Sequence, residues 1–237
     1  IPGFAGRPSA ELAGRWTQYG ALSAFCRYHN MSGEADQYPW SFGSGVERRT
    51  REAIRMRYRL LPYLYAAFIE ATETGAPVMR PLVFHHQQDR QARETDDAFL
   101  LGPALLVAPI TEAGQTSRNV YLPEGSWMEF HTGEVLEGAQ FVTAGAPLDR
   151  CPVFLRAGAV VPLYTEPPVS TMGYQPECID LHLLLPSEDG QLVSSLWEDD
   201  GVTRARERGA LLRTTFRVVR AGASVTLTAG VSGNGYP

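Results

Sequence analysis

The sequence predicts an α+β protein in which the last strand and helices of a (β/α)8 barrel precede two all-β, sandwich-like domains. Helical periodicity dominates up to Gly75, and a short buried strand interrupts it. Beyond Gly75, apolar runs of about four to seven residues alternate with turn signals. A barrel that ends and continues into β-sandwiches produces this order of helix, strand, helix and then strands alone.

Length and composition restrict the class of protein. The 237 residues are 44% hydrophobic and 20% charged, which is typical of a globular chain. No apolar run approaches the ~18–20 residues that cross a membrane. The net charge of −5 argues against nucleic acid as a partner, and all 21 basic residues are arginine, which excludes a Schiff-base or phosphate-loop lysine. A neutral or polar small molecule fits this composition better.

The first predicted helix begins after Ser9, a good N-cap, and Glu11 lies in its first turn. Leu12, Trp16 and Tyr19 recur at helical steps and predict one apolar stripe. The apolar run 21–26 follows and predicts a buried strand, which ends in the polar cluster 27–30.

The strongest element is a helix from Val46 to Thr74, which ends at Gly75. Pro62 lies within it and predicts a kink, because proline removes a backbone donor and crowds the preceding turn. Six side chains are predicted to share its apolar face: Ile54, Tyr58, Leu61, Tyr65, Phe68 and Ile69.

The β region divides at a proline-containing linker, Tyr164 to Gln175. Turn signals such as Gly102-Pro103 and Thr132-Gly133 separate its short runs and predict an antiparallel sandwich. We therefore predict domains at 1–75, 76–165 and 176–237. Asp199-Asp200-Gly201 predicts a tight turn in the last of them.

No cofactor or metal is expected. Adjacent residues on a strand point to opposite faces, so His85-His86 makes no metal pair. The spacing of Cys26, Cys151 and Cys178 fits neither a disulfide framework nor a zinc site. We therefore expect these three cysteines to be reduced thiols in a cytoplasmic protein.

Ordered motifs carry a family resemblance. They are Ile1-Pro2-Gly3-Phe4, residues 15–21, 25–30, 38–43 and 57–65, followed by residues 77–82, 152–158 and 197–201. Each motif alone is weak, but the ordered set resembles the C-terminal portion of glycoside hydrolase family 31, the α-glucosidase and α-xylosidase group. The resemblance implies a retaining α-glycosidase that acts on terminal α-linked glucosyl residues of an oligosaccharide or α-glucoside.

The resemblance implies that Phe4 packs against the sugar in the non-reducing-end subsite and that His29 hydrogen-bonds its hydroxyls. Both residues follow predicted strand ends, where barrel active sites lie. An aromatic face suits a pyranose, and imidazole donates or accepts. The alternatives are core packing for Phe4 and a structural role at the barrel rim for His29.

The resemblance also implies that two aspartates on earlier barrel strands carry the catalysis, and this chain does not contain them. A sequence that starts at Ile1, without methionine or signal peptide, is expected to be the interior of a longer protein. We expect the chain alone to be inactive and to need the missing N-terminal part of the barrel. Glucosidase, xylosidase and transglycosidase activities remain alternatives.

Two other function classes stay open. One is a carbohydrate-binding or domain-bracing β-sandwich module, in which Trp127 or Trp197 would be the binding aromatics if exposed, although tryptophans are more often buried in the core. The other is a split subunit that completes a partner's barrel. An incomplete barrel exposes apolar surface and strand edges, so association with a partner or with copies of the chain, as in a homo-oligomer, is expected.

Overall fold

The computed structural model describes residues 1–235. Its helices are α1 (Ala10–Ala21), α2 (Ser44–Arg59), α3 (Leu61–Thr74) and α4 (Arg90–Glu94), with short 3-10 helices η1 (Pro39–Phe42), η2 (Leu82–Phe84) and η3 (Ala205–Arg208). Its strands are β1 (Met79–Pro81), β2 (Phe99–Leu101), β3 (Leu105–Val107), β4 (Ser117–Leu122), β5 (Ser126–Glu129), β6 (Val135–Glu137), β7 (Gln140–Gly145), β8 (Val153–Arg156), β9 (Val160–Tyr164), β10 (Ile179–Leu183), β11 (Gly190–Glu198), β12 (Leu212–Ala221) and β13 (Ser224–Ser232).

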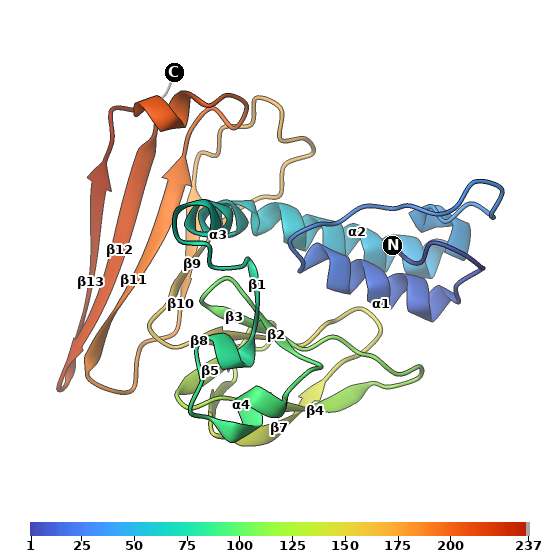
Figure 1. Cartoon of the computed structure of the whole chain (residues 1–237), viewed down its shortest axis with the longest axis horizontal. Helices are drawn as coiled ribbons and strands as arrows, with labels where there is room; N and C mark the ends of the chain where they lie inside the picture. Colours follow the sequence, from blue (N-terminus) through green and yellow to red (C-terminus); the bar gives the residue numbers. More distant parts are fainter. Residues whose placement is uncertain (236–237) are drawn as a thin grey trace.

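The α+β class is confirmed, and the elements lie in chain order along the molecule (Figure 1). Helices α1 and α2 form one end with the N-terminus, and strands β11, β12 and β13 form the other. Helix α3 lies between them, above the central β-sheets. Within residues 1–235, none of the helices combines the length and the apolar character that a bilayer crossing requires.

Helix α1 begins as predicted, because the Ser9 hydroxyl accepts the backbone N–H of Leu12 at 3.1 Å. The predicted apolar stripe is wrong, since Leu12 and Trp16 are exposed. The buried side instead carries Arg15 and Gln18, whose side chains bind backbone carbonyls of the β-sandwich. Hydrogen bonding to otherwise unpaired carbonyls outweighs hydrophobic periodicity on this face.

The predicted strand at 21–26 is wrong. Helix α1 runs to Ala21, a turn follows, and the next residues are extended without ladder partners among residues 1–235. The β-type backbone pairing that follows this run is one isolated parallel bridge, between Pro2 and His29. A buried parallel strand requires neighbours on both sides, and the described chain supplies a single bridge.

The predicted helix 46–74 is two helices rather than one kinked helix. Leu60, at φ −76° and ψ −4°, separates α2 from α3, and Pro62 stands in the first turn of α3. A proline is tolerated there because the first-turn N–H groups have no intrahelical acceptor. Each helix therefore buries its own face, and Phe68 is exposed. Helix α3 ends at Gly75, whose φ of +79° favours glycine, as predicted.

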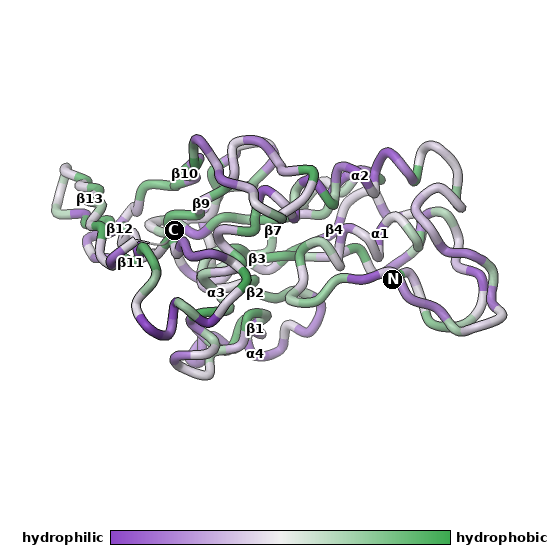
Figure 2. Tube along the Cα trace, turned by 90° about the horizontal axis from the view of Figure 1, so that it is seen from above, coloured by the Kyte–Doolittle hydropathy of each residue, from purple (hydrophilic) through white to green (hydrophobic). Residues whose placement is uncertain are grey.

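The central sandwich packs a six-stranded antiparallel sheet, ordered β1-β2-β3-β8-β5-β6, against the pair β4-β7. Successive residues of β3 enter different cores, because side chains alternate across a strand. Leu105 packs in a core with Leu64 of α3 and Leu163 of β9, and Leu106 packs in a second core with Trp127. These strands appear as hydrophobic stretches of the trace in Figure 2.

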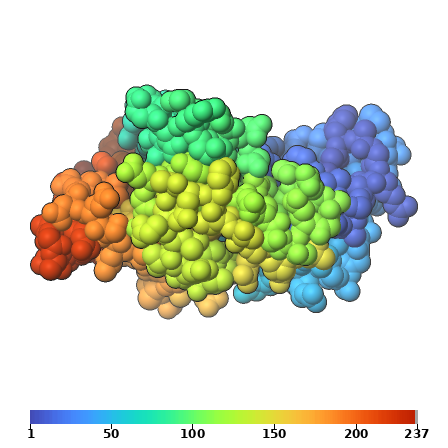
Figure 3. Space-filling model, turned by 90° about the horizontal axis from the view of Figure 1, so that it is seen from below, coloured from blue at the N-terminus to red at the C-terminus, as the bar shows by residue number. Residues whose placement is uncertain are grey.

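The last strands form a meander, β11-β12-β13, and the pair β9-β10. A small core of Val160, Leu196, Phe216 and Val218 joins them. Figure 3 shows this part as a block at the end of the molecule opposite the N-terminal helices. The predicted linker forms the loop between the paired strands β9 and β10, and the domain boundaries at 75, 165 and 176 stay predictions.

Two tryptophans that could have served as exposed sugar platforms are engaged. Trp127 is 0% exposed, and its indole N–H donates to the carbonyl of Pro123 at 2.8 Å. The Arg213 guanidinium lies over the Trp197 ring, 4.7 Å from its centroid. Trp127 therefore belongs to the core, where a residue this large fills the centre of the sandwich, and not to a surface that could bind sugar.

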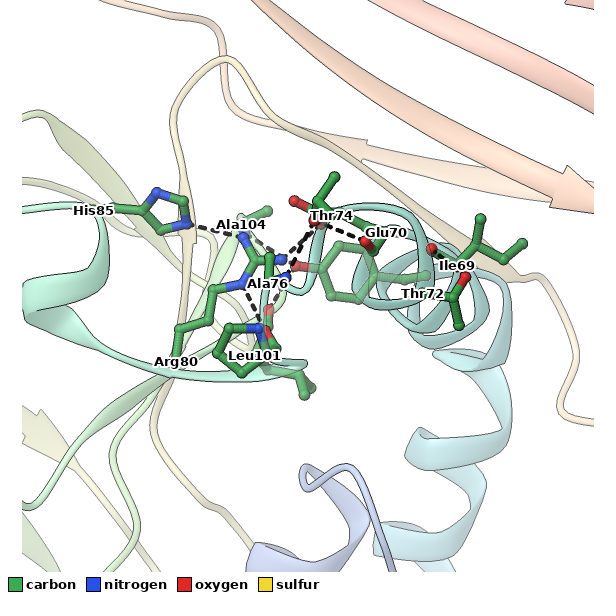
Figure 4. Close-up of polar contacts among 11 residues, drawn as sticks. Ile69, Glu70, Thr72, Thr74, Ala76, Arg80, His85, Leu101 and Ala104 are labelled. Carbon is green, nitrogen blue, oxygen red and sulfur yellow. Dashed lines mark hydrogen bonds and ion pairs between the residues drawn. The ribbon is translucent and has the colours of Figure 1, made fainter.

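Arg80 of β1 ties helix α3 to the central sheet and is 1% exposed (Figure 4). Its guanidinium donates to Glu70 of α3 at 2.6 Å, to the carbonyl of Pro77 at 2.8 Å and to the His85 ring at 2.9 Å. Because arginine is always a donor, His85 accepts through Nε2 and carries its ring proton on Nδ1. Burial, reinforced by the Arg80 charge, lowers the pKa of His85.

Tyr63 of α3 provides a test of this junction. Its buried hydroxyl donates to the Leu101 carbonyl at 2.6 Å and accepts the Ala104 N–H at 3.0 Å, and burial raises its pKa. Tyr63→Phe leaves both backbone groups unpaired, so we expect a loss of about 2 kcal/mol in unfolding free energy. Urea denaturation measures it, with the half-buried Tyr58→Phe on the neighbouring helix as the control. Equal midpoints for the two variants would contradict the expectation.

Candidate functional site

The structure brings Phe4 and His29 together. The bridge between Pro2 and His29 aligns the two segments, and the Met31 N–H donates to the Phe4 carbonyl at 2.7 Å. The two rings then lie 5.4 Å apart between centroids at an interplanar angle of 35°. Phe4 is 57% exposed and His29 is also exposed, so neither belongs to a core. Their roles toward a sugar stay predictions.

Arg57 of α2 positions the segment that leads to His29. Its guanidinium donates to the carbonyls of Ala21 at 3.1 Å and Ser23 at 2.6 Å, and so binds the last turn of α1 and the turn beyond it. Burial lowers the pKa of Arg57, which stays charged at neutral pH because its ordinary pKa is far above 7. The C-terminal end of a helix favours such a cation.

Tyr28 fixes the residue immediately before His29. The Thr17 hydroxyl donates to the Ala13 carbonyl at 2.9 Å, so the Tyr28 hydroxyl, 2.6 Å from Thr17, is the donor between them. In an extended segment, neighbouring side chains point to opposite sides. Tyr28 therefore packs onto α1, and His29 faces away from it. The nitrogen of Ile1 donates to the Arg27 carbonyl at 3.0 Å, and this hydrogen bond joins the first residues of the chain to the segment that carries His29.

Exposed aromatic side chains gather on this N-terminal part, and the sequence prediction did not include them as site residues. Phe25 is 73% exposed and carries the Arg27 guanidinium 5.9 Å from its centroid. Tyr38 and Trp40 stack at 5.0 Å and are also exposed. The aromatic content of residues 31–45 was the signal that could have identified Tyr38 and Trp40. Exposed apolar surface of this kind marks a ligand or partner contact.

Asp199 and Asp200, which the sequence places in a tight turn, have structural partners. Asp199 accepts the Tyr65 hydroxyl and the Gly201 N–H, and Asp200 accepts the Thr203 N–H, which confirms the predicted turn. Burial, with Asp199 beside it, raises the pKa of Tyr65 to about 12. No cluster of three or more His, Cys, Asp or Glu side chains within residues 1–235 is arranged to hold a metal ion.

The pair therefore offers an aromatic face and a hydrogen-bonding imidazole on an exposed surface. Such a pair can bind a pyranose through its apolar face and its hydroxyls. Hydrolysis with retention would further require two carboxylates about 5–5.5 Å apart. The chemistry of Phe4 and His29 is that of binding.

Comparisons with known proteins place the chain in one family. Residues 1–67 match the sequence model of the glycosyl hydrolases family 31 TIM-barrel domain, and residues 75–161 match that of the family's C-terminal domain. Alpha-glucosidase 2 of Bacillus thermoamyloliquefaciens is 38% identical over 218 residues, which are 92% of this chain and 27% of that protein. Human neutral alpha-glucosidase C is 39% identical over 203 residues, 85% of this chain and 22% of that protein.

Solved structures agree with these relatives. A family 31 dextranase of Flavobacterium johnsoniae, complexed with glucose, matches with a TM-score of 0.86 at 32% identity, over 96% of this chain and 28% of that one. An alpha-xylosidase of Xanthomonas citri matches with a TM-score of 0.80 at 32% identity, over 96% of this chain and 24% of that one. The chain thus spans about a quarter of the length of these relatives. The two domain matches, the relatives and the shared fold show that this chain belongs to glycoside hydrolase family 31.

Proposed function

We propose that the complete protein is a retaining, α-glucosidase-like hydrolase of terminal α-linked glucosyl residues. In it, this chain supplies one wall of the sugar subsite and the accessory β-sandwich domains. The observation that carries the proposal is the exposed Phe4–His29 pair, which two segments 25 positions apart hold at 5.4 Å. The relatives support the proposal, because alpha-glucosidases recur among them.

The two catalytic carboxylates would come from the barrel strands that this chain does not contain. One would attack the anomeric carbon while the other protonates the glycosidic oxygen, and water would then hydrolyse the glycosyl-enzyme intermediate. Phe4 would stack on the sugar ring, and His29 would hold its hydroxyls during both steps. The chain alone would bind sugar weakly and turn over no substrate.

The remaining barrel is the proposed partner of the N-terminal surface. Phe25 and Trp40 are exposed beside a single parallel bridge, as expected for strand and helix faces that other barrel strands cover. The cytoplasm is the proposed location, and it is supported by the free thiols of Cys26, Cys151 and Cys178. The substrate is proposed to be an oligosaccharide or an α-glucoside.

His29→Ala in the complete enzyme tests the sugar role. We expect transition-state stabilisation to fall by about 1–3 kcal/mol, or roughly 5- to 150-fold in kcat/KM, because the hydroxyl partners of the imidazole stay unpaired. An aryl α-glucoside is the substrate. The melting temperature of each variant is measured alongside, so that a loss of activity through misfolding is distinguished from a loss of sugar contacts.

Met31→Ala, an exposed neighbour, is the matched control and should keep full activity. An unchanged catalytic efficiency in the His29→Ala enzyme would remove His29 from the site. Hydrolysis of the same glucoside by the 237-residue chain, above the level of its His29→Ala variant, would refute the proposal that the catalytic carboxylates lie on barrel strands outside this chain.

A further inference from the structure

A second cavity, of about 440 Å³, lies between the central sandwich and the last strands, away from Phe4 and His29. Four segments form its walls: the pair His85-His86 after η2, the β4–β5 turn, the β8–β9 turn and the β10–β11 loop. Its volume is that of a pocket for a molecule of monosaccharide size, within the lower range of small-molecule sites.

One backbone and one side-chain hydrogen bond join the walls of this cavity, which we name the seam pocket. The Gly158 N–H donates to the Leu184 carbonyl at 2.7 Å, and the Ser126 hydroxyl donates to that of Ser187 at 2.9 Å. Gly158 has a φ of +81°, which favours glycine, and the Leu192 side chain of β11 packs against this turn. These contacts hold the segments around the seam pocket together.

Two nitrogen groups on one wall lack partners. The Arg156 guanidinium is half-buried and has no ion pair or hydrogen bond within residues 1–235; burial alone lowers its pKa. The His86 Nε2 atom is buried and also has no hydrogen-bond partner there. An unpaired buried polar group costs about 1–3 kcal/mol, and an unpaired cation costs more. Either a ligand or ordered water in the cavity can satisfy both groups.

The Arg156 charge also acts on both neighbouring histidines. It contributes to lowering the pKa of His85 and, after burial, is the largest cause that brings the pKa of His86 to about 4. Both rings are therefore neutral at pH 7, and Arg156 is the charged group of this wall. One guanidinium matches one carboxylate, which it binds through two parallel hydrogen bonds.

The other polar residues of the lining have different chemistry. They are Ser187 and the carboxylates Glu124, Glu188 and Asp189, and all four are exposed. Hydroxyl and carboxylate oxygens hydrogen-bond sugar hydroxyls well, whereas three carboxylates repel a ligand with several negative charges. The seam pocket thus favours one anionic group beside Arg156 and hydroxyl groups along the rest of its lining.

We propose that the seam pocket binds a hydroxylated carboxylate of monosaccharide size, a hexuronate, with Arg156 and His86 at its carboxylate and the Ser187–Glu188 wall at its hydroxyls. This site is separate from the Phe4–His29 subsite, and the proposal does not depend on the function proposed above. It assigns a ligand to groups that the fold leaves unpaired.

Calorimetric titration of the 237-residue chain with glucuronate, glucose and inorganic phosphate tests the proposal. We expect glucuronate to bind at least 10-fold more tightly than either of the others, because glucose lacks the carboxylate and phosphate lacks the hydroxyl-bearing ring. Glucose or phosphate binding as tightly as glucuronate would overturn it, and so would no glucuronate binding at 20 mM.

Two variants test the assigned walls. Arg156→Gln should weaken glucuronate binding at least 10-fold without lowering the melting temperature, since the guanidinium has no structural partner within residues 1–235. Glu188→Gln should strengthen binding several-fold, because the amide still hydrogen-bonds the ligand's hydroxyls while the charge that repels its carboxylate is gone, and this gain does not depend on any loss of folding. Arg90→Gln, on an exposed arginine paired with Glu94, is the matched control and should change neither quantity. An Arg156→Gln chain that binds normally, or that is strongly destabilised, would contradict the assignment.

Discussion

Arg15→Met is expected to lower the free energy of unfolding by about 4 kcal/mol, a larger loss than we expect for Tyr63→Phe or for any change at Arg80. The buried guanidinium of Arg15 joins helix α1 to the central sandwich. Its Nη1 atom donates to the carbonyls of Pro147 and Arg150, both at 2.9 Å. Its Nη2 atom donates to the carbonyls of Gln115 at 2.9 Å and Ala146 at 2.7 Å.

The size of this effect follows from the acceptors rather than from the charge. Methionine fills part of the volume but donates nothing, so the carbonyls of Arg150, Gln115 and Ala146 lose the guanidinium at once. The Pro147 carbonyl keeps the Arg150 N–H at 2.9 Å. Each unpaired buried carbonyl costs about 1–3 kcal/mol before relaxation and water entry reduce the sum. Burial lowers the pKa of Arg15, but the guanidinium remains protonated at neutral pH.

Urea denaturation at neutral pH measures the Arg15 effect. Arg15→Lys should recover part of the loss, because an ammonium group retains three donors but not the planar fork. Arg48→Met, on the exposed side of α2, is the matched control and should be neutral. A loss below about 1 kcal/mol for Arg15→Met, with an unchanged denaturant slope, would show that these carbonyls find other partners.

Arg80→Met should cost about 3 kcal/mol, the second largest effect, because it empties a fully buried cation site between α3 and β1. Pro77 loses the donor to its carbonyl, and His85 loses the donor to its ring nitrogen. Glu70 is partly exposed, so water can solvate its carboxylate once Arg80 is gone. Glu70→Gln should therefore cost less than Arg80→Met, and the reverse order would contradict this assignment.

The same substitution has a signature in the pH dependence of stability. The pKa of His85 is lower in the folded state than in the unfolded state. The stability that neutral His85 contributes is therefore fully present above its unfolded-state pKa of about 6.5. It is lost as the pH falls through the lowered folded pKa, since the unfolded state then binds the additional proton. Without Arg80 the pKa of His85 moves back toward its ordinary value. Stability in the Arg80→Met variant should therefore decline less steeply below pH 6.5.

Local signals in the sequence predicted the helix boundaries well. Ser9 caps α1, Gly75 ends α3 and Asp199-Asp200-Gly201 forms a turn, because each depends on residues within a few positions. The proximity of Phe4 and His29 was predicted from the ordered motifs and is confirmed, although the segment before His29 forms a single bridge rather than the predicted strand. Their proximity is a property of the fold, and the ordered motifs carried that information.

Long-range contacts decided what the sequence pattern could not. The apolar stripe of α1 is exposed because Arg15 and Gln18 on its other side satisfy carbonyls about 100 to 135 positions away. Leu60 divides the predicted single helix, so that α2 and α3 bury different faces. Hydrophobic periodicity describes one element, and it does not record which partner the element meets.

The amino-acid sequence alone predicted the fold class and the family. It also predicted the two residues, Phe4 and His29, that we propose to bind the sugar. Those properties rest on local propensity and on motifs read in sequence. Only the folded chain showed the anchoring role of Arg15, the burial of Trp127 and the unpaired nitrogens of Arg156 and His86. Each depends on atoms that are distant in sequence and adjacent in space, and burial sets the energy of a polar group by what surrounds it.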